Sequence, residues 1–267
     1  MQFRGKAMHA EQIYLSRHGE IASLVLNRPS KHNALTEAMW REIPDLLAEA
    51  EADRDIQVLI VRGKGGAFAA GADISEFEEV YATAERAAAY SRAIGEALDG
   101  LARFSKPTIA AIEGACVGGG CALALACDLR FAAQGARFGV TPAKLGLVYP
   151  FNDMRRLVST VGASAAKDLL FTARLVDAET ALQMGLINRL MPQGILAEAV
   201  EEYVSHITQT SSHTAKITKQ MIALIEAGQD EDCEQTRQLF LEAFSGEHFQ
   251  EGYQAFLEKR RPNFPKP

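Results

Sequence analysis

The sequence predicts an α/β fold in which strands and helices alternate over the first two thirds of the chain and helices alone follow. Apolar runs typical of buried strands precede two glycine-rich turns, at 65–74 and 114–128, and Ala-rich segments of helical length separate the strands. Toward the C-terminus the apolar residues recur only at helical spacing. We therefore expect a boundary near residue 195, between a core over 1–195 and a helical region over 196–267.

The composition is that of a globular protein that folds without covalent or metal support. Hydrophobic residues make up 48% of the 267 residues, which is enough for a core of its own. The net charge of −6 and the lack of a long Lys/Arg block argue against a nucleic-acid partner and against a membrane surface. Neither the four cysteines nor the six histidines show metal-ligand spacing, so we expect no metal site. Because the cysteines are not distributed like a disulfide framework, we expect a reducing, cytoplasmic location, and with no secretory apolar segment at the start we expect a soluble protein.

In chain order, the first half is expected to open with a β-hairpin formed by 13–15 and 21–26. Thr36 suits the N-cap of a helix that reaches about Ala52, and Pro44 is expected to kink or restart that helix. The next elements, up to the second glycine turn, are a strand at 56–62, a helix over roughly 83–104 and a strand at 108–112.

The second half continues the alternation and then turns helical. We expect a strand at 129–132, a short helix between an N-cap at Asp177 and a terminating Gly185, and a strand at 186–190. Aromatic residues are dense near the C-terminus, more than one terminal helix could bury, so we expect self-association. The final helices are predicted at 195–207, 217–225, 233–244 and 249–257.

The two glycine turns are the candidate site of chemistry. Gly118, Gly119 and Gly120 carry no Cβ, so their backbone can approach another molecule closely, and the first turn of a following helix leaves N–H groups unpaired. Such a turn is suited to an anion or an oxyanion. The alternative is that the glycines only let a helix pack tightly on a sheet. Since 65–74 has the same form, N–H groups from two loops could surround one developing negative charge.

Together these turns closely resemble the crotonase superfamily, the enoyl-CoA hydratase/isomerase family. The residues that match its two motifs are Phe68, Ala70, Gly71, Asp73 and Ile74 in the first turn, and Gly114 and Gly118 to Gly120 in the second. The resemblance runs from 26–35 to 256–264. It implies a spiral core of repeated ββα turns with a C-terminal helical trimerisation region. It also implies an acyl-CoA substrate with no separate cofactor, and a homotrimer or a hexamer made of two trimers.

The same resemblance assigns site residues position by position. It implies that the N–H groups of Ala72 and Gly119 form an oxyanion hole for the thioester oxygen. Read from the residues alone, an Asp beside a glycine turn, such as Asp73 or Asp128, more often caps backbone N–H groups, and exposed basic residues are often only solvated. The positions implied for substrate or CoA binding are Arg28, Lys31, Ala70, Asp73, Ile74 and Gly118, with Phe240 and Lys259 reaching from a neighbouring subunit.

Two positions depart from the hydratase pattern of the family. Its hydratases use two glutamates, at positions where this chain has Ala122 and Pro142, and neither residue can activate water or carry a proton. The segment 138–149 is most similar to the methylmalonyl-CoA decarboxylase branch, in which the position of Tyr149 is an active-site tyrosine. That branch has a glutamate where Ala122 stands and a histidine where Ala72 stands.

The sequence thus predicts an acyl-CoA enzyme that stabilises a thioester enolate. C–C cleavage such as decarboxylation is the leading reaction, because it requires no general base. Tyr149, together with Thr141, would orient the leaving carboxylate or protonate the enolate. The alternatives are a hydratase or isomerase with unconventional groups among Tyr149, Glu113, Asp153 and Glu76, and a catalytically inactive acyl-CoA-binding subunit.

Overall fold

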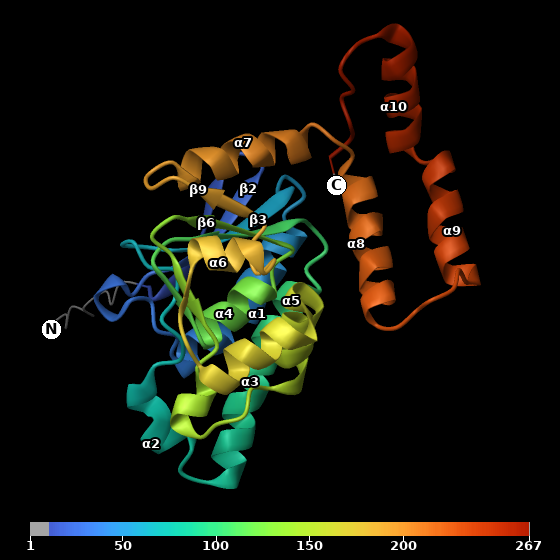
Figure 1. Cartoon of the computed structure of the whole chain (residues 1–267). Coiled ribbons are helices and arrows are strands. Elements are labelled where there is room, and N and C mark those ends of the chain that lie inside the picture. Colours follow the sequence, from blue (N-terminus) through green and yellow to red (C-terminus); the bar gives the residue numbers. More distant parts are fainter. Residues whose placement is uncertain (1–10, 267) are drawn as a thin grey trace, which may run out of the picture.

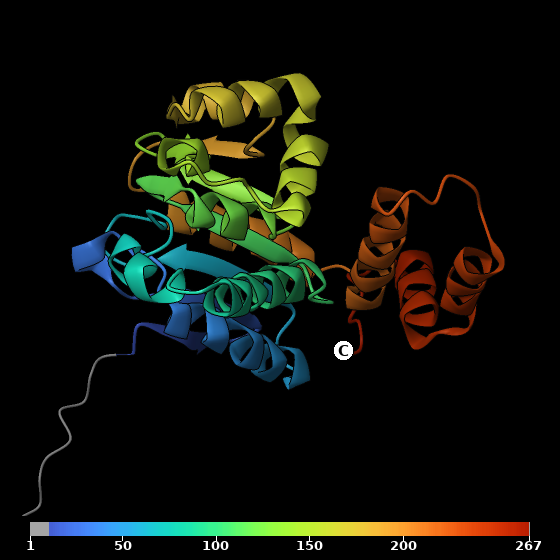
Figure 2. The same cartoon turned by 90° about the horizontal axis from the view of Figure 1, so that it is seen from below.

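The computed structural model describes residues 11–266, as an α/β core followed by a helical unit that stands beside it (Figures 1 and 2). The strands are β1 (Ile13–His18), β2 (Ile21–Leu26), β3 (Val58–Gly63), β4 (Thr108–Ile112), β5 (Ala115–Val117), β6 (Leu129–Ala133), β7 (Arg137–Gly139), β8 (Val176–Asp177) and β9 (Arg189–Met191). The main sheet has the order β1-β2-β3-β4-β6-β9, and β5, β7 and β8 form a second sheet. Only β1 and β2 pair antiparallel in the main sheet.

The helices alternate with these strands up to β9 and then follow one another. They are α1 (Glu37–Ala52), α2 (Phe77–Val80), α3 (Ala84–Ala102), α4 (Gly119–Leu125), α5 (Phe151–Thr172), α6 (Ala178–Gln183), α7 (Leu196–Thr208), α8 (Ser212–Glu226), α9 (Glu234–Glu242) and α10 (Glu247–Glu258). Short 3-10 turns occur at η1 (Pro29–Lys31), η2 (Ile74–Glu76), η3 (Pro142–Leu145) and η4 (Ala243–Ser245).

The main sheet is covered on both faces, because its strands direct alternate apolar residues to two cores. In β3, Leu59 and Val61 face the larger core, which also contains buried residues of α1, α3 and α4. Val58 and Ile60 face the smaller core, where Leu196 of α7 packs. The buried sheet is therefore a rigid support for the loops that leave its strands.

Most of the expected elements are present, and their caps are those read from the sequence. The hairpin of β1 and β2 is confirmed. Thr36 caps α1 by accepting a hydrogen bond from the Met39 N–H at 3.3 Å. Asp177 caps α6 through the Thr180 N–H at 2.9 Å, and Gly185 follows that helix with a φ of +78°.

Three expectations need correction. The restart of the helix at Pro44 is wrong, because α1 runs through this residue, which withholds the hydrogen bond to the Trp40 carbonyl; a kink at Pro44 stays a prediction. The strand expected at 186–190 starts later, at β9, since the Leu186 N–H bonds back to the Ala181 carbonyl at 2.8 Å and is not part of a strand ladder. The sequence patterns predicted no element at α5, β7 or β8. They also did not predict the short β5, which lies within the glycine motif.

The C-terminal helices fall into two groups. α7 lies on the sheet, whereas α8, α9 and α10 form the unit at the right of Figure 1 that stands beside the core. The division near residue 195 stays a prediction, and the last helix that packs on the sheet lies on its C-terminal side. Within residues 11–266 no helix combines the length and the apolar character needed to cross a membrane.

Candidate active site

The two glycine turns lie side by side at the carboxyl ends of β3 and β4. The Ala69 N–H donates to the Ala115 carbonyl at 2.8 Å, and the Val117 N–H donates to the Ala69 carbonyl at 3.0 Å, so the turns are joined by a parallel bridge. Gly120 completes the contact, because a Cβ there would lie 2.3 Å from the Ala69 oxygen. The third glycine of the triple thus permits the first turn of α4 to touch the other loop.

One backbone donor of the first turn, the N–H group of Ala72, points away from its bridging partner. Leu35 bridges to this residue by accepting from the Asp73 N–H and donating to the Gly71 carbonyl, both at 2.8 Å. In a parallel bridge the residue between the two bonded neighbours points its own N–H away from the partner. Within the described part of the chain, no acceptor is recorded for the Ala72 N–H.

The N–H group of Gly119 lies close to that of Ala72. Gly119 is the first residue of α4, whose leading N–H groups have no helical partner, and it follows Gly118 with φ +52° and ψ −115°, a conformation that requires glycine. A methyl group built on Gly119 would lie 3.5 Å from the Ala72 nitrogen. Two N–H groups from separate loops, neither with an acceptor in the part of the chain that the structure describes, therefore border one small volume, which is the geometry of an oxyanion hole.

Tyr149 lies in the core around α4, with its hydroxyl buried and without a hydrogen-bond partner among the described residues. Burial, and then the neighbouring Cys121 and Asp153, raise the pKa of this phenol well above its ordinary value. At neutral pH the group therefore remains protonated and is a proton donor with no acceptor between residues 11 and 266.

Asp153 is the buried carboxyl group nearest in chain to this tyrosine. It lies in the first turn of α5, is 4% exposed, and pairs with Arg156 at 2.9 Å. Burial raises the pKa of Asp153 to about 6, against the opposing effect of Arg156 and with a further rise from Asp99. A carboxyl group with such a pKa can exchange a proton near neutral pH.

The positions of the two family glutamates offer no acid or base in this chain. Ala122 is buried in α4, and Pro142 starts η3. Thr141 does approach the glycine turn, because its Oγ1 lies 3.7 Å from the position of a Cβ on Gly118. The structure thus brings Thr141 to the expected site, but no carboxylate at either glutamate position.

Of the other two candidate bases, Glu76 uses its carboxylate in a structural hydrogen bond, whereas Glu113 contributes a backbone contact. The Glu76 carboxylate accepts a hydrogen bond from the Glu37 N–H at 2.7 Å, so it caps the start of α1. The Glu113 carbonyl accepts from the Phe68 N–H at 2.7 Å, which fixes the backbone between the turns and assigns nothing to its side chain.

Arg28 and Asp73 form a largely buried ion pair at 2.8 Å. The Arg28 guanidinium also donates to the Ala34 carbonyl. Asp73 accepts from the Ser75 hydroxyl and N–H, and these bonds and Arg28 hold the pKa of Asp73 below its usual value. The capping interpretation of Asp73 is therefore confirmed, and a role of either residue in CoA binding stays a prediction.

The remaining binding positions lie at the rim of the turns or on the helical unit. Lys31, Ala70 and Ile74 are exposed, and the Ala70 N–H donates to the His32 carbonyl at 2.9 Å, which joins the two loops that carry them. Phe240 lies on α9 and Lys259 ends α10, in the unit beside the core. Within this chain they are not brought to the rim, so their predicted contact with CoA requires another subunit.

Asn33 is a buried residue within the stretch that resembles the family, but no role was predicted for its side chain. Its Oδ1 accepts from the Arg28 N–H at 2.8 Å, and its Nδ2 donates to the Ala67 carbonyl at 2.6 Å and to that of Lys64 at 3.0 Å. Asn33 thus ties the loop before α1 to the first glycine turn. Asn33 lies in the loop that begins at Pro29, and no local sequence pattern there predicts a contact with the first glycine turn.

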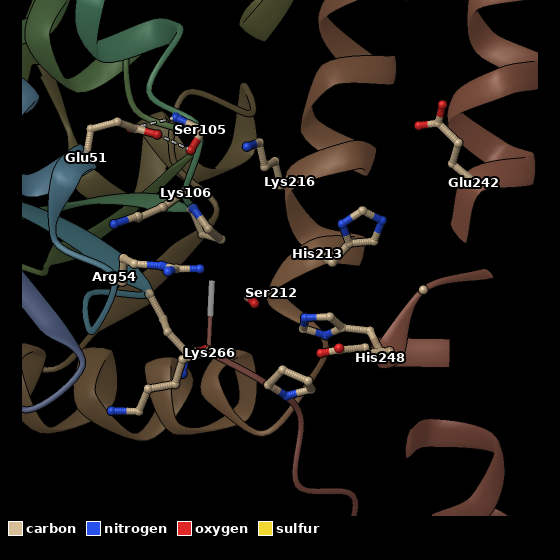
Figure 3. A pocket seen from close by; sticks show the side chains of 15 residues that line it. Glu51, Arg54, Ser105, Lys106, Ser212, His213, Lys216, Glu242, His248 and Lys266 are labelled. Carbon is tan, nitrogen blue, oxygen red and sulfur yellow. Dashed lines mark hydrogen bonds between the residues drawn. The ribbon is translucent and has the colours of Figure 1, made fainter. Parts of the chain in front are cut away.

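A cavity of about 470 Å³ separates the core from the helical unit, away from these turns (Figure 3). Figure 3 shows Arg54 and Lys106 on the core side, with His213 and His248 opposite. Pro107, which also lines it, precedes β4, so the cavity lies at the other end of that strand from the glycine triple. Within residues 11–266, no group of three His, Cys, Asp or Glu side chains could hold a metal ion.

Comparison with known proteins gives consistent matches over nearly the whole chain. A family model described as enoyl-CoA hydratase/isomerase matches residues 16–267. The short-chain-enoyl-CoA hydratase of Clostridium acetobutylicum is 33% identical over 95% of this chain and 97% of its own. The 2,3-dehydroadipyl-CoA hydratase of Escherichia coli is 33% identical over 95% and 98%. The solved structure of an enoyl-CoA hydratase/isomerase family protein from Hyphomonas neptunium has a TM-score of 0.94 at 48% identity, covering 96% of this chain and 98% of that one. The expected ββα fold is thereby confirmed.

Proposed function

The chain belongs to the enoyl-CoA hydratase/isomerase family, and from this premise we propose that it is an enzyme that binds an acyl-CoA thioester and stabilises its enolate. The observation that carries the proposal is that the N–H groups of Ala72 and Gly119 lie close together, and neither has an acceptor within residues 11–266. Fixed donors of this kind stabilise the negative charge that develops on a thioester oxygen.

Hydration or isomerisation of an enoyl-CoA is the reaction that we favour. Relatives that share a third of the sequence are named hydratases, which supports this reaction over the decarboxylation suggested by the resemblance of 138–149. Because Ala122 and Pro142 cannot move protons, the reaction requires other groups.

Tyr149 and Asp153 are the groups that we assign to proton transfer. The protonated phenol of Tyr149 has no acceptor in the described chain and can donate to the α-carbon of the enolate. The Asp153 carboxylate, whose pKa is about 6, can accept a proton from water in hydration or from the substrate in isomerisation, and the acid so formed can reprotonate the Tyr149 phenolate. Isomerisation only moves a proton from one carbon of the substrate to another. It therefore requires less of Tyr149 and Asp153 than hydration, which must also activate a water molecule.

Decarboxylation of a malonyl-type thioester is the second candidate. It is favoured by the two non-ionisable residues, Ala122 and Pro142, because loss of CO₂ delivers electrons to the thioester oxygen without a general base. In that reaction Tyr149 and Thr141 would orient the carboxylate or protonate the product enolate.

A panel of substrates distinguishes these reactions. Purified protein is incubated with crotonyl-CoA, a 3-enoyl-CoA, malonyl-CoA and methylmalonyl-CoA, and the products are followed by mass spectrometry and absorbance. We expect turnover of an enoyl thioester. Loss of CO₂ alone would replace the favoured reaction by decarboxylation, and binding without any turnover would leave an inactive acyl-CoA-binding subunit. If no thioester binds at millimolar concentration, the whole proposal is wrong.

We also propose a homotrimer or a hexamer of two trimers. Large apolar side chains of α9, η4 and α10 are exposed in the single chain: Phe240, Leu241, Phe244, Phe249, Tyr253, Phe256 and Leu257. Contiguous apolar surface of this kind marks an interface. In such an assembly Phe240 and Lys259 could reach the CoA of a neighbouring subunit, beside Arg28, Lys31, Ala70 and Ile74.

A further inference from the structure

The start of α1 contacts both candidate oxyanion donors. Leu35, two residues before this helix, is bonded to Gly71 and Asp73 on either side of Ala72, at 2.8 Å in each case. Trp40, in the first turns of the same helix, reaches the other donor: a methyl group on Gly119 would lie 3.1 Å from the Trp40 Cζ2. One short stretch of chain thus holds one loop by hydrogen bonds and meets the other by ring contact.

The contact of Trp40 with Gly119 is rigid. The indole is fully buried, in the same core as the residues of α3 and α4. Packed cores are dense and change shape little, so the ring edge limits how closely α4 can approach α1. The same built methyl group would lie 3.5 Å from the Ala72 nitrogen, so the ring edge, Gly119 and Ala72 border one volume.

The edge of the six-membered part of the indole is what faces Gly119, because Cζ2 in that part is the atom that a Cβ on Gly119 would meet. The buried Trp40 Nε1 interacts with the Tyr90 hydroxyl, in a geometry looser than an ordinary hydrogen bond. What the indole adds over a phenyl ring at Gly119 is therefore the reach of its six-membered part.

We propose that Trp40 is a positioning residue that sets the separation of the Ala72 and Gly119 N–H groups. The inference rests on the proposed oxyanion function of these groups. Trp40 itself does not touch the reacting atoms. It acts through Gly119, while Leu35 holds Ala72 in register with the same helix.

The test compares Trp40→Phe with Leu47→Ala. Phenylalanine stays in the core but lacks the ring edge at Gly119, so we expect kcat to fall about 10- to 100-fold with KM changed less than about threefold, because donor alignment matters most in the transition state. Leu47 is the matched control: it is buried in α1 but contacts α3, where its Cδ1 lies 3.5 Å from the position of a Cβ on Gly100. Leu47→Ala should lower the unfolding temperature and leave kcat near the wild-type value.

A second readout reports on the donors without turnover. The infrared carbonyl band of bound butyryl-CoA, labelled with ¹³C at the thioester, should move to lower wavenumber in the wild type and Leu47→Ala, and by clearly less in Trp40→Phe. Should Trp40→Phe fail to fold, Trp40→Met takes its place, because methionine fills irregular core gaps.

The outcomes separate the two proposals. An unchanged band shift and kcat in the folded Trp40 variant would overturn the positioning role and leave the oxyanion hole intact. A wild-type protein that binds the thioester without any band shift would instead overturn the oxyanion hole.

Discussion

A β-carbon on Gly120 would lie 2.3 Å from the carbonyl oxygen of Ala69, so the two glycine turns touch at a point where only glycine fits. Gly120→Ala should therefore push the turns apart. We expect a loss of about 1–3 kcal/mol in the free energy of unfolding, as for an overpacked core, together with reduced turnover. Denaturant unfolding and steady-state kinetics measure the two effects.

Gly95→Ala is the matched control for that substitution. Gly95 lies inside α3, and a Cβ there would meet no atom within 4 Å. Alanine should stabilise this helix by about 0.5–1 kcal/mol. Equal losses of stability in both variants would show that the contact with Ala69 is unimportant.

Tyr149→Phe removes a buried hydroxyl that has no partner, and it keeps the ring. Stability should stay the same or rise, whereas kcat should fall about 10²- to 10⁴-fold if the phenol transfers a proton. The control is Tyr203→Phe on α7, which removes a hydroxyl beside the smaller core, on the other face of the sheet. Full activity of Tyr149→Phe would show that the phenol transfers no proton, and it would not contradict the oxyanion hole.

Asp153 makes the stability of the fold depend on pH. Its pKa is raised from 3.8 to about 6 by burial, so the folded state binds more protons than the unfolded state between these values. The contribution of Asp153 to stability is full below about pH 4 and is lost as the pH rises through 6. Asp153→Asn removes this dependence, so its stability relative to wild type should increase from pH 4 to pH 7, by at most about 3 kcal/mol.

Urea unfolding at several pH values measures this difference. Asp168→Asn, later in α5, is the control, because its carboxylate is exposed and pairs with Arg174. A stability difference for Asp153→Asn that falls over the same pH range would contradict the raised pKa.

Self-association should depend on the apolar face of α10. Phe256 is 81% exposed in the single chain, and Phe256→Glu would place a charge in the proposed interface. Light scattering should give a trimer or hexamer for the wild type and a smaller species for the variant. Gln254→Glu, a charge on an exposed position of the same helix, is the control. A wild-type monomer of 29.0 kDa at micromolar concentration would refute the assembly.

Local sequence signals predicted the elements but not how they meet. The caps at Thr36 and Asp177 and the apolar strands could be read directly, since each depends on a few neighbouring residues. The bridge of Leu35 to Ala72 and the contact of Trp40 with Gly119 join residues that lie more than 35 positions apart. No local periodicity encodes such contacts.

The features that the sequence did not predict also lack a clear local pattern. β5 is only three residues long and lies among glycines, so it shows no alternation. The kink within α5, at Gly162 with φ +76°, interrupts the helical pattern of that segment. The ion pair of Arg28 and Asp73 gives structural partners to two residues that the family resemblance places at the CoA site, and their contact with CoA stays a prediction.

The most direct test of the central claim is a crystal structure of the protein with an unreactive acyl-CoA. We predict that the thioester oxygen lies about 2.7–3.1 Å from the nitrogens of both Ala72 and Gly119. A thioester seated elsewhere, with both N–H groups facing water or protein, would contradict the proposed oxyanion hole.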